Sequence, residues 1–323
     1  MGVARSSAPA LKVEIFSLTK KAMSIIRIIV AALGVSLAWV SMLGQEAGFR
    51  RTLAVSIAEP VVLDIAVSRG DVNIGYARDG EVSFSASAKD VAGKIVGADY
   101  FKTALLIEQH ENHILIRESL ATAAELKFNV SYRIDVPFQT EVRSSVTGLG
   151  NQKLIGIAGP AKLSNGAGDI EATLVRFASV EAITGKGNIS CSRSAQVVAQ
   201  TGAGNITLME DGPSKAAVKK GAGRIEVGGL RGGFEGATDL GELHIKAILN
   251  DDWHLTSVAG NIRIEVPSKA KFCLDASTLA GIIYVEHSAM EKPSEDARQL
   301  RQEVNGGGKS IQARSNNGNI FIQ

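Results

Sequence analysis

A short phrase, Gly-x-Ile-x-apolar, recurs eight times between residues 168 and 322 and constrains the fold more than any other feature. Successive glycines are 19, 17, 19, 18, 19, 21 and 37 residues apart, and the last interval is a doubled one that contains an insertion. The glycines that open the phrases are Gly168, Gly187, Gly204, Gly223, Gly241, Gly260, Gly281 and Gly318. A fixed period of this length is typical of a repeat architecture.

Alignment of the eight phrases shows two apolar columns on one side of a strand. The position two after the glycine is Ile in every phrase except one, which has Leu243, and the position four after it is always apolar. The column between them holds Glu171, Ser190, Thr207, Glu226, His244, Arg263, Tyr284 and Phe321. This alternation with a period of two predicts a strand with one buried face.

A second strand is predicted before each glycine. The positions seven and five before it are mostly apolar, as in Val180 and Ala182, and the position three before it is Thr, Ser or Asn, with Lys220 as the exception. One such unit cannot bury its apolar face, whereas stacked units can. The sequence therefore predicts an all-β β-solenoid, a two-sheeted β-roll or flattened parallel β-helix of about 19 residues per coil.

The first 44 residues differ from the repeat. Residues 28–44 form an apolar run without charge, and basic residues precede it. This order is typical of a secretory signal, so residues 1–44 are predicted to be a signal peptide or an N-terminal membrane anchor, with Met1 or Met23 as the start. The body that follows carries a net charge close to −2, because residues 1–44 hold five basic residues and one acidic residue of a chain whose net charge is +2. The charge argues against a nucleic-acid partner.

Two further parts are expected after this segment. Residues 45–160 are predicted to be an N-terminal β cap module with the first irregular coils, in which 104–119 and 127–142 form hairpin-like pairs. Residues 161–323 are predicted to be the regular β-solenoid, with an insertion at 290–308 that contains a short helix. The chain closes on a strand, so the last coil is expected to lack a cap.

A family resemblance rests on the order of four motifs. GDVNI at 70–74 is followed by IDVP at 134–137, by the serial Gly-x-Ile strands, and by the closing run GGGKSIQARSNNGNIFIQ. Over roughly residues 55–323 the chain resembles the bacterial β-strand-repeat "putative adhesin" domain of unknown function. The resemblance implies export and a β-solenoid fold, and its motifs carry no functional residue over to this chain.

The sequence assigns no catalytic, cofactor-binding or metal-binding residue. Cys191 is expected to face inward and Cys273 outward, too far apart for a disulfide. His110 and His113 are interpreted as flanking a polar turn, and the asparagines after the glycines as satisfying turn backbone. Trp253 is expected in the core. The histidines expected to face outward in different coils are His244, His254 and His287.

Carboxylates and outward aromatic residues are given structural interpretations. Glu171 and Glu226 share an outward column but lie three coils apart, farther than a pair of glycosidase carboxylates. Asp239 with Glu242, and Asp251 with Asp252, are interpreted as solvated surface pairs. Tyr284 and Phe321 are interpreted as two isolated rings, not as a platform for sugars.

The predicted function is an exported, non-catalytic β-solenoid that acts as a structural or adhesin-like interaction scaffold of the cell envelope. Its partner is an envelope protein or a glycan, without a cofactor, and membrane association through residues 28–44 stays open. One alternative is a polysaccharide-acting β-helix enzyme with a groove near Asp239 and Glu242, which clustered acidic and basic side chains on one sheet face would favour. The other is a membrane-anchored accessory protein of envelope-stress signalling.

Overall fold

The computed structural model describes residues 48–90, 92–119, 129–175, 178–210 and 215–323. The signal or anchor predicted for residues 1–44 lies outside the described residues and stays a prediction. Within the described ranges, no helix has the length and hydropathy needed to cross a membrane.

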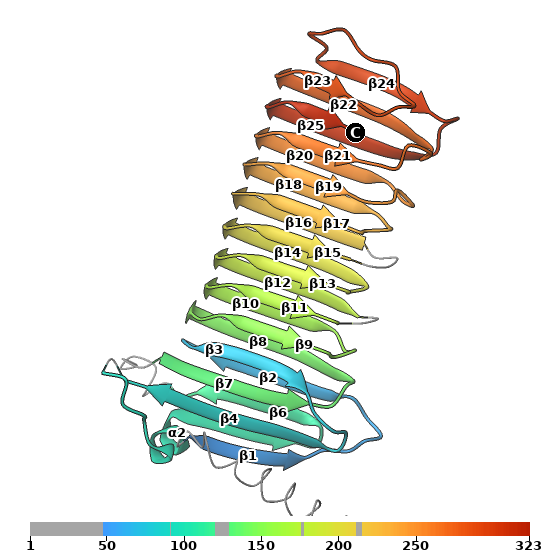
Figure 1. Ribbon diagram of the computed structural model, residues 1–323. Coiled ribbons are helices and arrows are strands. Elements are labelled where there is room, and N and C mark those ends of the chain that lie inside the picture. Colours follow the sequence, from blue (N-terminus) through green and yellow to red (C-terminus); the bar gives the residue numbers. More distant parts are fainter. Residues whose placement is uncertain (1–47, 91, 120–128, 176–177, 211–214) are drawn as a thin grey trace, which may run out of the picture. The chain divides into compact units, whose positions relative to one another are not determined.

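Residues 48–323 form two sheets of 13 strands each, which stack coil upon coil in Figure 1. Sheet A consists, in spatial order, of β1 (Phe49–Ala54), β4 (Glu81–Lys89), β7 (Asn129–Val136), β3 (Asp71–Tyr76), β9 (Gln152–Ile155), β11 (Ile170–Thr173), β13 (Ile189–Ser192), β15 (Ile206–Met209), β17 (Ile225–Gly228), β19 (Leu243–Lys246), β21 (Ile262–Glu265), β26 (Ile320–Ile322) and β23 (Ile283–Val285). The all-β solenoid predicted from the repeat is therefore confirmed.

Sheet B carries the longer strand of each coil. It consists, in spatial order, of β24 (Gln299–Val304), β22 (Phe272–Ala280), β25 (Lys309–Asn317), β20 (Trp253–Ala259), β18 (Phe234–Leu240), β16 (Lys215–Ala222), β14 (Gln196–Ala203), β12 (Ser179–Lys186), β10 (Ala161–Ala167), β8 (Thr140–Leu149), β2 (Val61–Val67), β6 (His113–Glu118) and β5 (Leu105–His110). One short helix, α2 (Ala98–Ala104), lies before β5.

Each coil runs along sheet B, turns at the glycine and returns along sheet A. Strands of neighbouring coils pair in parallel and in register, so that Ile189 of β13 lies beside Ile170 of β11 and Ile206 of β15. The three side chains are buried, and together with the facing column of sheet B they form the core between the sheets. The two apolar columns read from the sequence are this core, because in-register pairing stacks equivalent residues.

The corner of each coil is held by glycine and by the residue after it. Gly187 has a φ of 144°, and a Cβ there would overlap the carbonyl oxygen of Gly168 in the preceding coil. Beside it, the Oδ1 atom of Asn188 accepts the backbone N–H of Asn205 at 2.8 Å, and Asp169 in turn accepts that of Asn188 at 2.7 Å. The structural interpretation of the corner asparagines is thus confirmed.

The N-terminal region closes one end of the stack with antiparallel strands. In sheet A, β1 pairs antiparallel with β4 and β4 with β7, and in sheet B the hairpin β5–β6 covers β2. The hairpin expected over 104–119 is confirmed, but the one expected over 127–142 is wrong. Its two strands, β7 and β8, belong to different sheets, because the chain crosses between sheets at Pro137.

The other end departs from the sequence order. The coil of β25 and β26 lies between the coil of β20 and β21 and that of β22 and β23, and Figure 1 shows β25 between β20 and β22. The expectation that this last coil lacks a cap is therefore wrong, because β22 and β23 cover it. The short helix expected in the insertion is also wrong: residues 299–304 form β24, which pairs antiparallel with β22 while Val304 is buried and Leu300 packs against the core.

Candidate functional site

The histidines singled out in the sequence are dispersed. His110 and His113 face each other across the β5–β6 turn, which confirms the interpretation of a polar turn, and His113 Nε2 contacts Asp64. His254 is exposed on β20 as expected. His287 is buried, not outward, because it continues the inward alternation of Ile283 and Val285, and its ring packs against Phe272 with centroids 5.7 Å apart. Within the described ranges, no group of three His, Cys, Asp or Glu residues could hold a metal ion.

The cysteines and Trp253 lie where the sequence places them. Cys191 is buried and Cys273 is exposed, and both are free. Burial, together with the nearby Glu210, raises the pKa of the Cys191 thiol to about 12, so this thiol stays protonated and unreactive. Trp253 is fully buried and its Nε1 donates to the Gly232 carbonyl at 2.9 Å.

Glu171 and Glu226 are not brought together, whereas Asp251 lies beside Asp252 and accepts its backbone N–H at 3.1 Å. Glu171 forms an ion pair with Lys153 at 2.8 Å, and two strands lie between its strand and that of Glu226. Asp251 lies near Lys215 and Lys309, at 3.3 and 3.4 Å. A backbone hydrogen bond from Asp252 and these two lysines hold the pKa of Asp251 below its usual range, which is the behaviour of a surface carboxylate.

Charged side chains do cluster on the outer face of sheet A, over β17, β19 and β21. Glu265 accepts hydrogen bonds from Lys246 at 2.9 Å and from His244 at 2.8 Å. Glu242 lies 3.9 Å from Arg224 and 4.0 Å from Arg263. The bonds from Lys246 and then His244 lower the pKa of Glu265, so this carboxylate stays ionised.

The two outward aromatic residues are not isolated, as the sequence interpretation held, but stacked. The rings of Tyr284 and Phe321 have centroids 5.1 Å apart and an interplanar angle of 9°, and the Arg263 guanidinium lies 5.3 Å from the centroid of the Phe321 ring. The insertion adds β24 to sheet B and no strand to sheet A, so β23 and β26 are direct neighbours. The stack thus crosses β21, β26 and β23.

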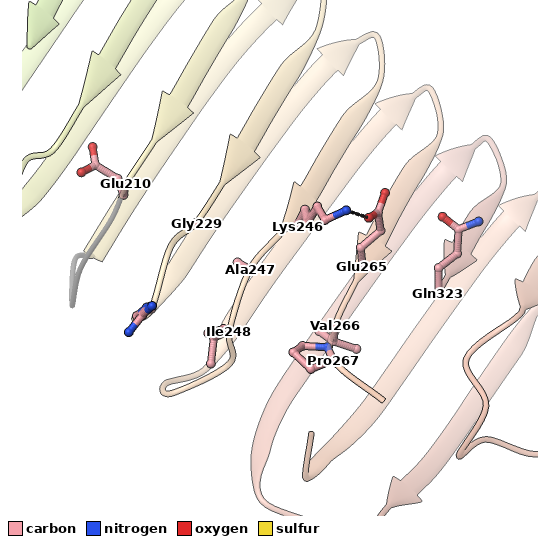
Figure 2. A pocket seen from close by; sticks show the side chains of 10 residues that line it. Glu210, Gly229, Lys246, Ala247, Ile248, Glu265, Val266, Pro267 and Gln323 are labelled. Atoms are coloured by element: carbon pink, nitrogen blue, oxygen red, sulfur yellow. Dashed lines mark ion pairs between the residues drawn. The ribbon is translucent and has the colours of Figure 1, made fainter. Parts of the chain in front are cut away.

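A groove of about 810 Å³ runs along the ends of the sheet A strands beside this face. Figure 2 shows its lining side chains on successive coils, with the Lys246–Glu265 ion pair at one wall. The floor is made largely of small or apolar residues. The lining residues are Glu210, Gly229, Arg231, Lys246, Ala247, Ile248, Glu265, Val266, Pro267 and Gln323. Because they come from five adjacent coils, the groove extends about 19 Å across the strands.

The groove was not foreseen from the sequence, since its residues follow the repeat's last apolar column, where the turns vary in length. Glu210 lies at one end, where it is buried and accepts the Ser194 backbone N–H at 2.6 Å. Gln323 lies at the other end and donates to Glu286 at 2.7 Å. The sequence held one indication of the groove: the acidic residue Glu210 directly after a strand with a buried face.

Fold and surface together define the class of this protein: a two-sheeted parallel β-solenoid with an open, polar and partly aromatic outer face and an adjoining groove. The chain belongs to the family described as Toastrack DUF4097, which matches residues 160–323. The resemblance read from the sequence motifs is thereby confirmed. No curated protein matches the sequence.

Several solved structures are similar to this chain at low identity. One is described as a "putative adhesin" from Bacteroides fragilis, with 11% identity, coverage of 85% of this chain and 97% of that chain, and a TM-score of 0.35. A "putative lipid binding protein" from Parabacteroides distasonis has 10% identity, coverage of 87% and 98%, and a TM-score of 0.33. A "putative cell adhesion protein" from Clostridium sporogenes has 10% identity, coverage of 85% and 98%, and a TM-score of 0.22.

Proposed function

We propose that this protein is an exported, non-catalytic interaction scaffold of the cell envelope, which binds a partner along the outer face of sheet A. The observation that carries the proposal is the groove next to the clustered polar and aromatic side chains. Both are built from rigid strand ends on adjacent coils, so the stacking of coils itself positions the binding groups. The apolar run at 28–44 supports export.

The polysaccharide-acting enzyme remains a second candidate, because acidic and basic side chains do cluster on one sheet face. A glycosidase needs a carboxylic acid that holds its proton near neutral pH. The pKa of Glu265 is lowered rather than raised, which disfavours it as a proton donor. Glu242 lies 3.9 Å from Arg224 and 4.0 Å from Arg263, within a cluster of ion pairs. These environments suit binding better than acid catalysis.

Export is tested by fusing alkaline phosphatase, which is active only outside the cytoplasm, to the C-terminus of the full chain. The fusion is expected to be active, and deletion of residues 1–44 is expected to abolish this activity. Sequencing the N-terminus of the recovered protein separates the two forms: a start near residues 45–48 indicates cleavage, and an intact N-terminus in the membrane fraction favours the anchored signalling accessory. A full-chain fusion that stays in the cytoplasm and shows no phosphatase activity contradicts export.

Binding is tested by co-sedimentation of the full chain with isolated cell envelopes. Ile248→Asp places a charge on the groove floor and is expected to weaken binding about tenfold. Val198→Asp is the matched control, because Val198 has nearly the same exposure, 41% against 42%, but lies on sheet B. Equal effects of the two substitutions, or no binding by the unaltered chain, contradict the scaffold. Release of reducing sugar from envelope polysaccharide identifies the enzyme instead.

A further inference from the structure

The last strand of sheet A in spatial order presents a partly exposed aromatic ring. Phe321 stacks against one face of the Tyr284 ring, and among the described residues no further strand of sheet A follows β23, whose outer edge is bonded at Ile283 by the Ala297 carbonyl. Tyr284 is 42% exposed. An exposed ring face of a tyrosine whose position is fixed by stacking is a surface on which the C–H groups of a sugar ring pack, because these groups carry the positive edge that a π face attracts.

Hydrogen-bonding groups of both kinds adjoin this ring on the same face of the sheet. Glu286 and Gln323 lie two residues beyond Tyr284 and Phe321, just past the ends of β23 and β26 and about 7 Å away, and they bond to each other at 2.7 Å. Lys246 and Glu265 follow on the next coils. Carboxylate oxygens accept, the ammonium donates, and the amide does both, which is the set that a polyhydroxyl ligand requires.

The groove continues this face away from the ring. Gln323 and Glu265 belong both to the outer face and to the groove wall, and the groove continues across the coils to Glu210. The exposed Ile248 and Pro267 supply apolar surface along the floor. A ligand that fits is therefore long and narrow, with an apolar side and a hydroxylated side, and it lies across the coils.

The charged side chains of this surface are balanced in number. Four are basic and four are acidic: Arg224, Arg231, Lys246 and Arg263 against Glu210, Glu242, Glu265 and Glu286. Little net charge is therefore available to attract a highly charged polymer, and charged walls disfavour an acyl chain. We infer that the Tyr284 ring, the Gln323–Glu286 pair and the groove form a binding site for an uncharged linear glycan. The inference rests on the proposed function and names its partner class.

The test measures binding of four neutral hexasaccharides to the full chain by calorimetry: cellohexaose, chitohexaose, maltohexaose and xylohexaose. At least one is expected to bind. Tyr284→Ala is expected to weaken that binding about tenfold, whereas Tyr284→Phe, which keeps the ring, changes it less than about threefold. Thermal unfolding of each variant shows that the fold is kept.

Tyr76→Ala is the matched control, since Tyr76 is a 56% exposed aromatic on β3 of the same sheet that also contacts another ring, Phe138. It is expected to leave binding unchanged. The inference is overturned if none of the four hexasaccharides binds, if a hexamer of galacturonic acid binds more tightly than all of them, or if Tyr76→Ala weakens binding as much as Tyr284→Ala. Envelope binding that persists without hexasaccharide binding preserves the scaffold and makes its partner a protein, whereas loss of both overturns the proposed function as well.

Discussion

Two neighbouring stretches of the coil stack share one repeat but differ at their corners. In the coils of β12 and β14, Thr184 donates to the Gly168 carbonyl at 3.0 Å and Thr201 donates to that of Gly187 at 2.9 Å. On the other side of the corner, Asp169, Asn188 and Asn205 each accept a backbone N–H from the following coil. Both polar columns at the corners of this stretch, residues 161–209 as far as they are described, therefore stabilise the coil next to them.

The stretch 215–265 interrupts both columns, although Asn261 near its end again accepts a backbone N–H, that of Asn319, at 2.9 Å. Lys220 replaces the threonine, and its Nζ atom, Thr238 Oγ1 and Ser257 Oγ are buried without a hydrogen-bond partner in the described part of the chain. Arg224 and Glu242 replace the corner asparagines. Their side chains extend instead into the charged cluster on the outer face of sheet A.

The difference indicates that the first stretch keeps the residues that favour stacking of the coils. The second stretch has lost some of these residues, and it carries the charged part of the proposed binding surface. Positions that break a structural pattern without a local gain are where a functional constraint is expected. Substitutions at equivalent positions of the two stretches should therefore have unequal costs.

The largest effect is expected at the glycine corner of the regular stretch. Gly204 has a φ of 141°, and a Cβ there would overlap the Gly187 carbonyl oxygen, which is backbone and cannot move aside. Gly204→Ala is expected to lower the free energy of unfolding by about 4 kcal/mol or more, measured by urea denaturation. Gly93→Ala is the control, with a positive φ of 80° but open space around the added Cβ, and is expected to cost about 1 kcal/mol. Similar losses would show that φ alone, and not the close approach of coils, requires glycine.

The next effect is a gain of stability at Lys220. Burial without a partner lowers its pKa from 10.5 to about 8, so the folded state disfavours the charged amine. Lys220→Thr, which restores the repeat's residue, is expected to raise the free energy of unfolding by about 3 kcal/mol at pH 7. Lys219→Thr, at the exposed neighbour, is expected to change it by less than about 0.5 kcal/mol.

The pH dependence of this gain has a defined sign. Below pH 8 both states of the unaltered chain hold the proton and the penalty is complete. Between pH 8 and 10.5 only the unfolded state stays protonated, so the unaltered chain becomes relatively more stable as the pH rises. The advantage of Lys220→Thr should shrink over this window and vanish above it. An advantage that does not change with pH would show that packing, not charge, is responsible.

The sequence predicted the fold because equivalent residues of successive repeats become direct neighbours when the coils stack. Apolar columns such as Ile189 and Ile206 are the buried ladders, and Asn188 is the corner bond that was expected. The exchange of the last two coils could not be predicted, because the phrases at Gly281 and Gly318 are equivalent and both fit beside β21. A hydrophobic period specifies that coils stack, but not their order where an insertion is long enough to allow a crossover.

The candidate site was only partly predictable for a related reason. The outward positions of His244, Tyr284 and Phe321 followed from the alternation, but their partners did not. The stacked rings depend on an insertion that adds no strand to sheet A, and the groove depends on turns of unequal length around Glu210 and Gln323. Both features depend on how far apart neighbouring turns lie, and the alternation of residues along a strand contains no information on that distance.

A smaller effect distinguishes the hydroxyl columns of the two stretches. Thr201→Val removes a buried hydroxyl that donates to Gly187 and leaves that carbonyl unsatisfied, so a loss of about 1–2 kcal/mol is expected. Thr238→Val removes an equally buried hydroxyl whose Oγ1 has no partner in the described residues, and it is expected to be neutral or slightly stabilising. Thermal and urea unfolding of both variants measures the difference. Equal losses would indicate that a bound water completes the second column.

The smallest effect tests the corner asparagines, which are exposed. Asn188→Ala removes the acceptor of the Asn205 N–H and is expected to cost about 0.5–1 kcal/mol, because water partly replaces the lost bond. Arg224→Ala, at the equivalent position of the second stretch, loses an exposed ion pair at 3.9 Å and is expected to cost less than about 0.5 kcal/mol. The difference should persist in 1 M salt, because only the ion pair is screened. If Arg224→Ala costs as much as Asn188→Ala, the corner of the second stretch is held as firmly as that of the first, and the contrast between the stretches lies in the hydroxyl column alone.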